Sequence, residues 1–351
     1  MAASKPFRPG RRVFTAGALV TAATLGMPML RAQAKPEKPA LRISVGDLGS
    51  LYHLPLCIAD RMGYFAAAGL QVQIDDYGTG AAALHALLSG RADISAGAFK
   101  HLFNLQSRQQ YCTAFVVEGR APQVVTAVSL RQMPHYRSVE DLRGKRIGVS
   151  ALGATTHLAA SLLLSRGNLR SSDVTFVPVS LGDPAGQALL AGQVDAIATF
   201  DPLVTRLEQR GEVRVISDTR TLKDTQSIFG GPMPAGCLYA PEAFVQRRPQ
   251  TTQAVADAMV RALKWLQTAS PGDLVKTVPA AFLRDDRALY LAAFEKVREA
   301  ISPDGLVAED GPATALRVAA GFEPEIAAAQ LDVRRTFTNV FARRAKEHFE
   351  A

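Results

Sequence analysis

The sequence predicts an α/β protein built from two similar halves and a helical C-terminal segment. Short apolar runs typical of buried strands alternate with stretches whose apolar residues recur at helical spacing, a pattern that favours parallel sheets covered by helices on both faces. The order of elements between 41 and 98 returns between 146 and 199. The 351 residues, 48% of them hydrophobic, suffice for one large domain or two medium ones.

Each half is expected to hold short strands separated by helices. In the first half, strands are expected over 41–45, 71–75, 92–95, 113–117 and 124–130, and helices over 54–62, 80–90 and 100–107. In the second half, strands are expected over 146–150, 174–179, 194–199 and 213–217, and helices over 157–166, 184–191 and 202–210. After Pro241 prolines separate helices expected over 242–247, 250–269, 273–281, 285–300, 312–320 and 324–346.

Two matching segments carry the repeat most clearly. Residues 88–94 read Leu-Ser-Gly-Arg-Ala-Asp-Ile, and residues 190–196 read Leu-Ala-Gly-Gln-Val-Asp-Ala. In each segment a glycine is placed to end a helix, and an aspartate precedes the next strand. We therefore expect Asp93 and Asp195 to stabilise strand ends.

Residues 142–157 predict a turn, a strand, and a loop of small and hydroxyl residues that opens a helix. The N–H groups at the start of such a helix lack internal partners and carry the positive end of the helix dipole. This loop and the Gly78-Thr79-Gly80 loop of the first half could therefore hold an anionic or carbonyl-bearing ligand. The alternative is an ordinary strand–helix joint whose threonines cap the helix.

Residues 1–34 predict an export signal. They hold five of the 40 basic residues and none of the 32 acidic ones, with an apolar stretch over 15–30 and a small-x-small cleavage site over 32–34. The Arg11-Arg12 pair followed by Val-Phe is typical of a twin-arginine (Tat) signal, with a general secretory signal as the alternative. No later run of about 20 apolar residues exists, so we expect a mature protein that is soluble in the periplasm.

Charge and reactive residues exclude several classes of function. The formal charge is +8, but it is only +3 beyond residue 34, and no basic cluster is interleaved with aromatic residues, so nucleic-acid binding is not expected. Cysteines 57, 112 and 237 match no metal spacing and are expected to be buried free thiols. The histidines show no metal-ligand spacing, and no nucleophile pairs with a base, so we expect no metal, no cofactor and no enzymatic activity.

Residues 55–70, with their Gly-Tyr-Phe and Gly-Leu pairs, resemble the entry motif of a family of periplasmic ABC-transporter solute-binding proteins. This is the NMT1/THI5-like, SsuA-like family, related to sulfonate, nitrate and thiamine-pyrimidine binding proteins. Residues 141–149, 192–196 and 201–202 resemble its second signature. Each motif is weak alone, and their joint order and spacing over 41–300 carry the resemblance.

The resemblance implies a two-domain periplasmic-binding-protein fold of type II, hinged by two crossing strands near 127–131 and 231–238. Domain 1 would comprise 41–127 plus 239–351, and domain 2 would comprise 128–238. The resemblance also implies a monomeric component that closes on a small ligand and delivers it to an ABC permease. Two alternatives stay open: an exported pyrimidine-synthase-like enzyme on the same fold, and a sensor that presents its ligand to a membrane receptor.

The resemblance places the ligand in loops at the carboxyl ends of the strands. The residues expected there are Ser50, Leu51, Tyr52, His53, Gly78, Thr79, Gly80, Gly97, Ala98, Gly153, Ala154, Thr155, Thr156 and Asp201. Tyr52 and His53 would supply an aromatic wall and a donor, or would pack under the domain. Asp201 would accept from a ligand amine or cap the helix that follows Pro202. Sulfonates, carboxylates and heteroaromatics stay open as ligands, since helix starts and hydroxyls can bind them. A multiply charged phosphate is disfavoured because these loops hold no lysine or arginine.

Overall fold

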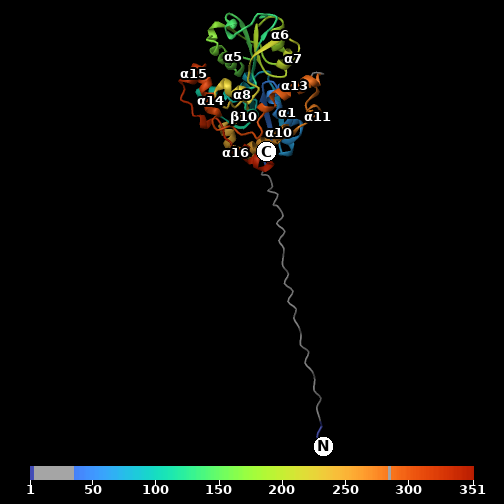
Figure 1. The fold of residues 1–351 in the computed structure, drawn as a ribbon. Coiled ribbons are helices and arrows are strands. Elements are labelled where there is room, and N and C mark those ends of the chain that lie inside the picture. Colours follow the sequence, from blue (N-terminus) through green and yellow to red (C-terminus); the bar gives the residue numbers. More distant parts are fainter. Residues whose placement is uncertain (4–34, 284–285) are drawn as a thin grey trace. The chain divides into compact units, whose positions relative to one another are not determined.

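The computed structural model describes residues 1–3, 35–283 and 286–351, and the helices and strands given below belong to the unit 35–351 (Figure 1). The predicted export signal, including Arg11 and Arg12, lies outside the described residues apart from the first three. No described helix combines the length and the apolar character that crossing a membrane requires.

Two five-stranded sheets organise this unit. The first sheet has the order β2-β1-β3-β10-β4, formed by Ala40–Val45 (β1), Gln71–Asp76 (β2), Ile94–Ala98 (β3), Cys112–Val117 (β4) and Gly236–Pro241 (β10). The second has the order β7-β6-β8-β5-β9, formed by Val125–Ser129 (β5), Arg146–Val149 (β6), Thr175–Pro178 (β7), Ala196–Thr199 (β8) and Val213–Asp218 (β9). The two orders are equivalent, so the predicted repeat and the α/β class are confirmed.

The sheets are mixed, so the expectation of parallel sheets holds for β1 with β2 and β3 and for β6 with β7 and β8, but not for the whole of either sheet. Strand β10 runs antiparallel to both β3 and β4, and β5 runs antiparallel to both β8 and β9. Each of these strands enters its sheet directly after the chain has crossed from the other sheet. The crossing reverses the direction in which the chain arrives, so the inserted strand cannot be parallel to its neighbours.

Two connections join the sheets. The first is residues 118–124, slightly before the expected crossing near 127–131, which is occupied by β5 itself. The second runs through 230–235 to β10, within the expected region. It is preceded by α8 (Leu222–Phe229), a helix that the sequence analysis missed; the Thr221 hydroxyl accepts from the N–H of Asp224 at its start.

Helices fill the connections within each half. The first half contains α1 (Leu54–Arg61), α2 (Tyr64–Ala67), α3 (Gly80–Leu88) and α4 (His101–Ser107), with a short 3₁₀ turn over Leu51–His53. The second half contains α5 (Thr155–Arg166), α6 (Asp183–Leu190) and α7 (Leu203–Gln209), with 3₁₀ turns over Val139–Leu142 and Ser171–Asp173. Figure 1 shows α5, α6 and α7 gathered around the second sheet.

The C-terminal segment is helical as expected, but it is more broken. Its elements are α9 (Glu242–Arg247), α10 (Pro249–Thr268), α11 (Pro271–Thr277), α12 (Ala280–Leu283), α13 (Arg287–Val297), α14 (Gly311–Ala320), α15 (Pro324–Ala328) and α16 (Val340–Phe349), with 3₁₀ turns over Arg298–Ala300 and Val333–Arg335. The helix expected over 324–346 is wrong. Phe337 instead forms a β-bridge with Ala114 of edge strand β4, and a helical residue could not do so.

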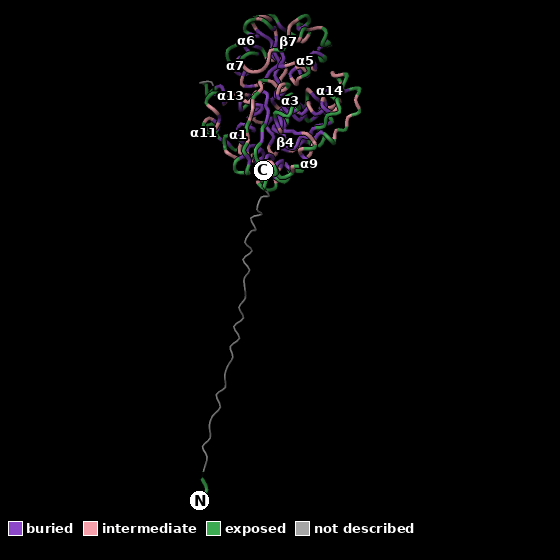
Figure 2. The backbone as a smooth tube through the Cα atoms, turned by 180° about the vertical axis from the view of Figure 1, so that it is seen from behind, coloured by how far each residue is buried: buried purple, intermediate pink, exposed green. Residues whose placement is uncertain are grey.

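The most extensive hydrophobic core of the described residues lies around α10, whose inner face packs against α1, α16 and the first sheet. Figure 2 shows buried segments, in purple, gathered in the interior. Met259, Leu263 and Leu266 are completely buried there, each contributing about 1.5–3 kcal/mol through loss of contact with water. Trp265 is partly buried and packs against this core. The three cysteines are buried and free, which confirms that expectation.

The two aspartates of the repeat act alike. A carboxylate oxygen of Asp93 accepts from the N–H of Arg42 at 3.1 Å, and one of Asp195 accepts from the N–H of Arg146 at 2.8 Å. Each therefore satisfies a backbone donor near the start of a strand, β1 for Asp93 and β6 for Asp195, and the expected stabilisation of strand ends is confirmed.

Candidate functional site

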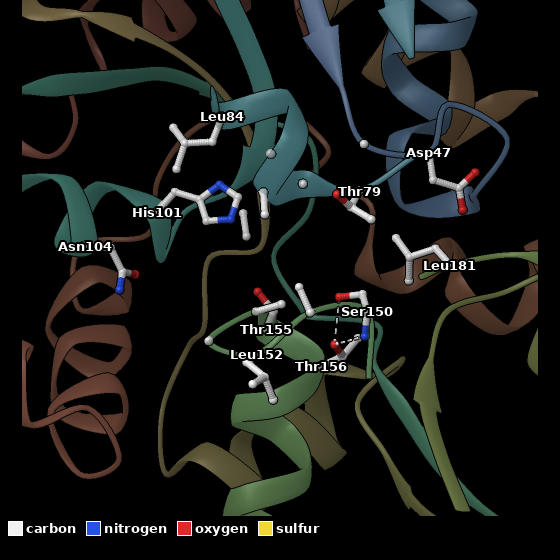
Figure 3. Close-up of a pocket in the computed structure, with 18 of the residues that line it drawn as sticks. Asp47, Thr79, Leu84, His101, Asn104, Ser150, Leu152, Thr155, Thr156 and Leu181 are labelled. Atoms are coloured by element: carbon white, nitrogen blue, oxygen red, sulfur yellow. Dashed lines mark hydrogen bonds between the residues drawn. The ribbon is translucent and has the colours of Figure 1, made fainter. Parts of the chain in front are cut away.

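A cavity of about 440 Å³ lies between the loops of the two sheets. Figure 3 shows Thr79, Leu84 and His101 of the first half on one side, and Ser150, Leu152 and Thr155 of the second half facing them. These loops follow the carboxyl ends of parallel strands, the edge at which open α/β sheets bind ligands.

Most of the residues expected at the site line this cavity. They are Ser50, Tyr52, His53, Thr79, Gly80, Gly97, Ala98, Gly153, Ala154, Thr155 and Thr156. They come from four separate segments, two of them at the starts of α3 and α5 and one at the end of β3. The structure thus brings together residues that are up to about a hundred positions apart.

Three expected residues do not line this cavity. Leu51 is fully buried in the core, and Gly78 lies just outside the lining. The Asp201 carboxylate is buried, where it accepts from the N–H of Thr205 at 2.9 Å and from Arg220 Nη1 at 2.9 Å. Asp201 therefore holds the start of α7, which matches the capping alternative considered for it.

The first turns of α3 and α5 face the cavity from opposite sides. At α3 the Thr79 hydroxyl accepts from the N–H of Ala82, while the N–H groups of Gly80 and Ala81 precede any intrahelical acceptor. No side chain within the described ranges caps α5. Its first N–H groups and the dipoles of both helices therefore favour an acceptor or anionic group in the space between them.

The two threonines of α5 have different roles. Thr156 is fully buried; its hydroxyl accepts from the N–H of Ser150 at 3.0 Å and contacts the Ser150 hydroxyl at 2.9 Å, which fixes the loop (Figure 3). The hydroxyl of Thr155 lines the cavity and has no partner among the described atoms, although it is shielded from solvent. A shielded hydroxyl without a partner is costly, so a ligand atom that bonds Thr155 would be favoured.

An aromatic wall closes one side. The Tyr52 ring lies 5.0 Å from the Phe200 ring and 4.9 Å from the His53 ring between centroids. His53 Nδ1 donates to a carboxylate oxygen of buried Glu118 at 2.9 Å. This bond fixes the ring orientation of His53. The two residues thus line the cavity and also pack beneath it, and their contact with a ligand stays a prediction.

His101 was not expected at the site. Its Nδ1 lies 2.9 Å from the Tyr239 hydroxyl, and burial is the main cause that lowers its pKa to about 3, with nearby Lys100 and His53 adding to the effect. His101 is therefore neutral at ordinary pH and lines the cavity as a dipole.

The C-terminal segment supplies a wall that sequence reasoning missed. Phe322, Glu323, Pro324 and Glu325 line the cavity at the break between α14 and α15. The Gly-Phe-Glu-Pro sequence at 321–324 was the available signal, because glycine followed closely by proline marks a helix break. Its position beside the sheet loops is a long-range contact that local patterns do not reveal.

Positive charge near the cavity is matched by carboxylates. Lys100 Nζ lies 2.7 Å from Glu323 Oε1, and Arg108 lies 3.7 Å from Glu325 on the exposed rim. Across residues 35–283 and 286–351, no group of three or more metal-ligating side chains gathers. The cavity therefore offers a ligand mainly neutral donors, helix dipoles and aromatic or aliphatic surface.

Residues 50–271 match the model of the family described as NMT1/THI5 like, which is well over half of the chain. The chain belongs to the NMT1/THI5-like family. The family expected from the sequence motifs is thereby confirmed. The matched range contains the loops of both sheets but not the C-terminal wall at 322–325.

Solved structures extend the NMT1/THI5-like comparison. One from Bordetella bronchiseptica RB50 is 46% identical, with a TM-score of 0.87 over 90% of this chain and 100% of that chain. The periplasmic aliphatic sulphonate binding protein SsuA from Escherichia coli is 19% identical, with a TM-score of 0.61 over 86% of this chain and 92% of that one.

The periplasmic nitrate-binding protein NrtA from Synechocystis PCC 6803 is 12% identical, with a TM-score of 0.68 over 90% of each chain. At these identities the likeness to SsuA and NrtA concerns the fold. Together with the two equivalent mixed sheets, it confirms the periplasmic-binding-protein fold class.

Proposed function

We propose that this protein is the extracytoplasmic solute-binding component of an ABC importer and that it binds one small organic ligand in the cavity between the two sheets. Membership of the NMT1/THI5-like family and the fold shared with SsuA and NrtA support this function. The export signal expected in residues 1–34 would direct the chain to the periplasm, where it would act as a monomer and pass its ligand to a membrane permease.

The observation that carries the proposal is the pair of helix starts, α3 and α5, that face each other across the cavity beside the unpartnered Thr155 hydroxyl. Backbone N–H groups and a hydroxyl bind sulfonate, carboxylate or ring-carbonyl oxygens without needing a positive side chain. The remaining lining, with Leu84, Leu152 and Phe200, suits an apolar or aromatic body attached to that group.

Ligand capture would follow closure of the two sheets around the cavity. The domain division expected from the sequence, 41–127 plus 239–351 against 128–238, is retained with its boundaries moved to the connections 118–124 and 230–235. Two thin connections allow a hinge rotation, and a ligand that contacts both sides stabilises the closed state alone.

A thermal-shift panel tests this function. The panel contains short alkanesulfonates, nitrate, monocarboxylates and pyrimidines. A ligand at about 100 times its dissociation constant should stabilise the native protein by roughly 2.7 kcal/mol. Failure of every member to raise the melting temperature would contradict the proposal.

Thr155→Val tests the site with nearly unchanged shape. We expect the dissociation constant of the best panel ligand to rise about 10- to 100-fold, because a hydrogen bond to a charged acceptor contributes about 1.5–3 kcal/mol. Thr175→Val, on the exposed start of β7, is the matched control and should bind as the wild type does. Equal affinities of the two variants would place the ligand elsewhere.

A further inference from the structure

Lys100 is a buried cation whose three N–H donors are all used inside the protein. Its side chain is 4% exposed, and Nζ donates to Glu323 Oε1 at 2.7 Å, to Asn104 Oδ1 at 3.0 Å and to the backbone oxygen of Gly153 at 2.6 Å. An ammonium group has three donors, so none remains for a ligand. Although it lies beside the cavity, Lys100 is committed to its neighbours.

These three acceptors belong to three different parts of the fold. Asn104 lies on α4 of the first half, Glu323 lies on the C-terminal wall, and Gly153 lies in the loop that opens α5 in the second half. The Asn104 amide also donates to the second oxygen of Glu323 at 2.7 Å, so the first two parts are tied together. The bond from Lys100 to Gly153 therefore links the first half and the C-terminal wall, on one side of the cavity, to the second half on the other side.

The Gly153 end of the link is held in a defined geometry. Gly153 has a φ of +77°, which L side chains rarely adopt, and its N–H donates to His157 Nδ1 at 3.0 Å. The carbonyl that Lys100 binds therefore belongs to a fixed loop at the start of α5. Because Gly153 lies directly before the first turn of α5, a displacement of its carbonyl would also displace the N–H groups at the start of that helix.

Burial makes this link costly to break. Burial lowers the pKa of Lys100, while the Glu323 carboxylate opposes this and favours the charged form. Opening the cleft would take the Gly153 acceptor away from a charged donor that is 4% exposed, so a bond made in a dehydrated site would have to be replaced by one to water.

A buried backbone bond, from the N–H of Leu51 to the oxygen of Asp201 at 3.1 Å, also joins the two halves, and every clasp variant keeps it. Two side-chain bonds across the cleft are weaker candidates for the role of Lys100. The Ser180 hydroxyl donates to the Gly78 oxygen at 3.4 Å, a long contact in an exposed position. Lys296 of α13 pairs with Glu208 of α7 at 2.8 Å, but the two side chains are 39% and 27% exposed, so water can replace the pair.

We propose that Lys100 is a positioning residue that holds the α5 lip against the first half and the C-terminal wall before any ligand binds. Lys100, Asn104, Glu323 and the Gly153 carbonyl form what we call the clasp. The clasp biases the ligand-free protein toward the closed state and so raises ligand affinity without touching the ligand, because the apparent affinity scales with the competent fraction. The consequence for affinity rests on the proposed function, whereas the bias itself does not.

Electron–electron distance measurements on the full ligand-free chain test the clasp. Spin labels at Ser89→Cys and Gln187→Cys report on the two halves, since both positions are exposed and the native cysteines are buried. The test variant is Lys100→Met with Glu323→Gln, which removes the ion pair and leaves no uncompensated charge. We expect its ratio of closed to open molecules to fall about tenfold or more, the effect of losing roughly one hydrogen bond to a charged group.

Lys296→Met is the matched control, because it removes another lysine that joins the same two halves while Glu208 keeps Arg220 as a partner. It should keep the wild-type distance distribution. Asn104→Ala, which keeps the ion pair, should open the cleft less than the double variant and serves if the latter does not fold. A wild-type distribution in both clasp variants, or an open ligand-free wild type, would overturn the proposal.

The distance measurement needs no ligand, so its failure differs from failure of the proposed function. Opening of the double variant while no panel compound shifts the melting temperature would support the clasp and overturn solute binding. Ligand-induced shifts with unchanged distances in the clasp variants would overturn the clasp alone.

Discussion

At the scale of single residues, the charged groups near the cavity are engaged with one another and the neutral groups are left over. Lys100 is bonded to Glu323, and His53 is bonded to Glu118. The shielded hydroxyl of Thr155 has no partner in the described part of the chain. A ligand that recruited Lys100 would first have to break a buried ion pair, which costs more than bonding an unused donor. A neutral or singly charged acceptor group therefore fits this site better than a multiply charged one.

The pH dependence of stability should report on His101. Its pKa is about 3 in the native protein, below the usual value near 6.5, so the unfolded chain binds more protons between these values. The contribution of neutral, buried His101 to the stability of the folded protein is therefore fully present above pH 6.5, and it is lost as the pH falls toward 3. We expect the free energy of unfolding of both proteins to change when the pH is lowered from 7.5 to 4. The decrease should be smaller in His101→Gln than in the wild type, by roughly 3 kcal/mol, because the variant has no histidine to protonate at this position.

Urea unfolding at the two pH values measures this difference. His135→Gln, at an exposed position, controls for the loss of one histidine. If His101→Gln and the wild type lost the same free energy between pH 7.5 and pH 4, His101 would not be held neutral by its surroundings.

At the scale of elements, the sequence predicted those helices and strands whose formation depends on neighbouring residues along the chain. The strands of both halves were predicted because buried strands and amphipathic helices have different periods. Helix α8 was missed although its signals were present, namely Thr221 with Asp224 three residues later at its start and Gly230 at its end. The break between α15 and α16 could not be predicted, because it depends on the bridge from Phe337 to Ala114, more than two hundred residues away.

The position of α3 depends on Gly46 in the loop after β1. A Cβ atom at Gly46 would lie 2.3 Å from the backbone nitrogen of Gly80, the first residue of α3. Gly46→Ala must therefore displace the helix start that faces the cavity. We expect a loss of about 1–3 kcal/mol in the free energy of unfolding, and a dissociation constant for the best panel ligand that is about tenfold higher or more.

Gly49→Ala is the matched control in the same loop. A Cβ atom there would meet its nearest neighbour at 3.5 Å, an ordinary contact. Urea unfolding and ligand titration of the two variants should separate them clearly. Equal behaviour of Gly46→Ala and Gly49→Ala would mean that the α3 start tolerates displacement.

At the scale of the described unit 35–351, the two sheets and the C-terminal segment together make the site. The repeat and the family motifs predicted the loops of both sheets, and eleven of the fourteen expected residues line the cavity. Leu51 and Asp201 are adjacent to it, but they serve the core and the start of α7. The wall at 322–325 and the Lys100–Glu323 pair depend on contacts between residues that are far apart in the sequence. Hydrophobic periodicity and short motifs therefore could not predict them.

A crystal structure of the protein grown with the panel ligand that gives the largest thermal shift tests the central claim most directly. We predict one ligand in the cavity of about 440 Å³, with its acceptor oxygens within hydrogen-bonding distance of the first N–H groups of α3 and α5 and of the Thr155 hydroxyl, while Lys100 remains bonded to Glu323. A ligand bound outside this cavity, or one held by Lys100 in place of Glu323, would contradict the account.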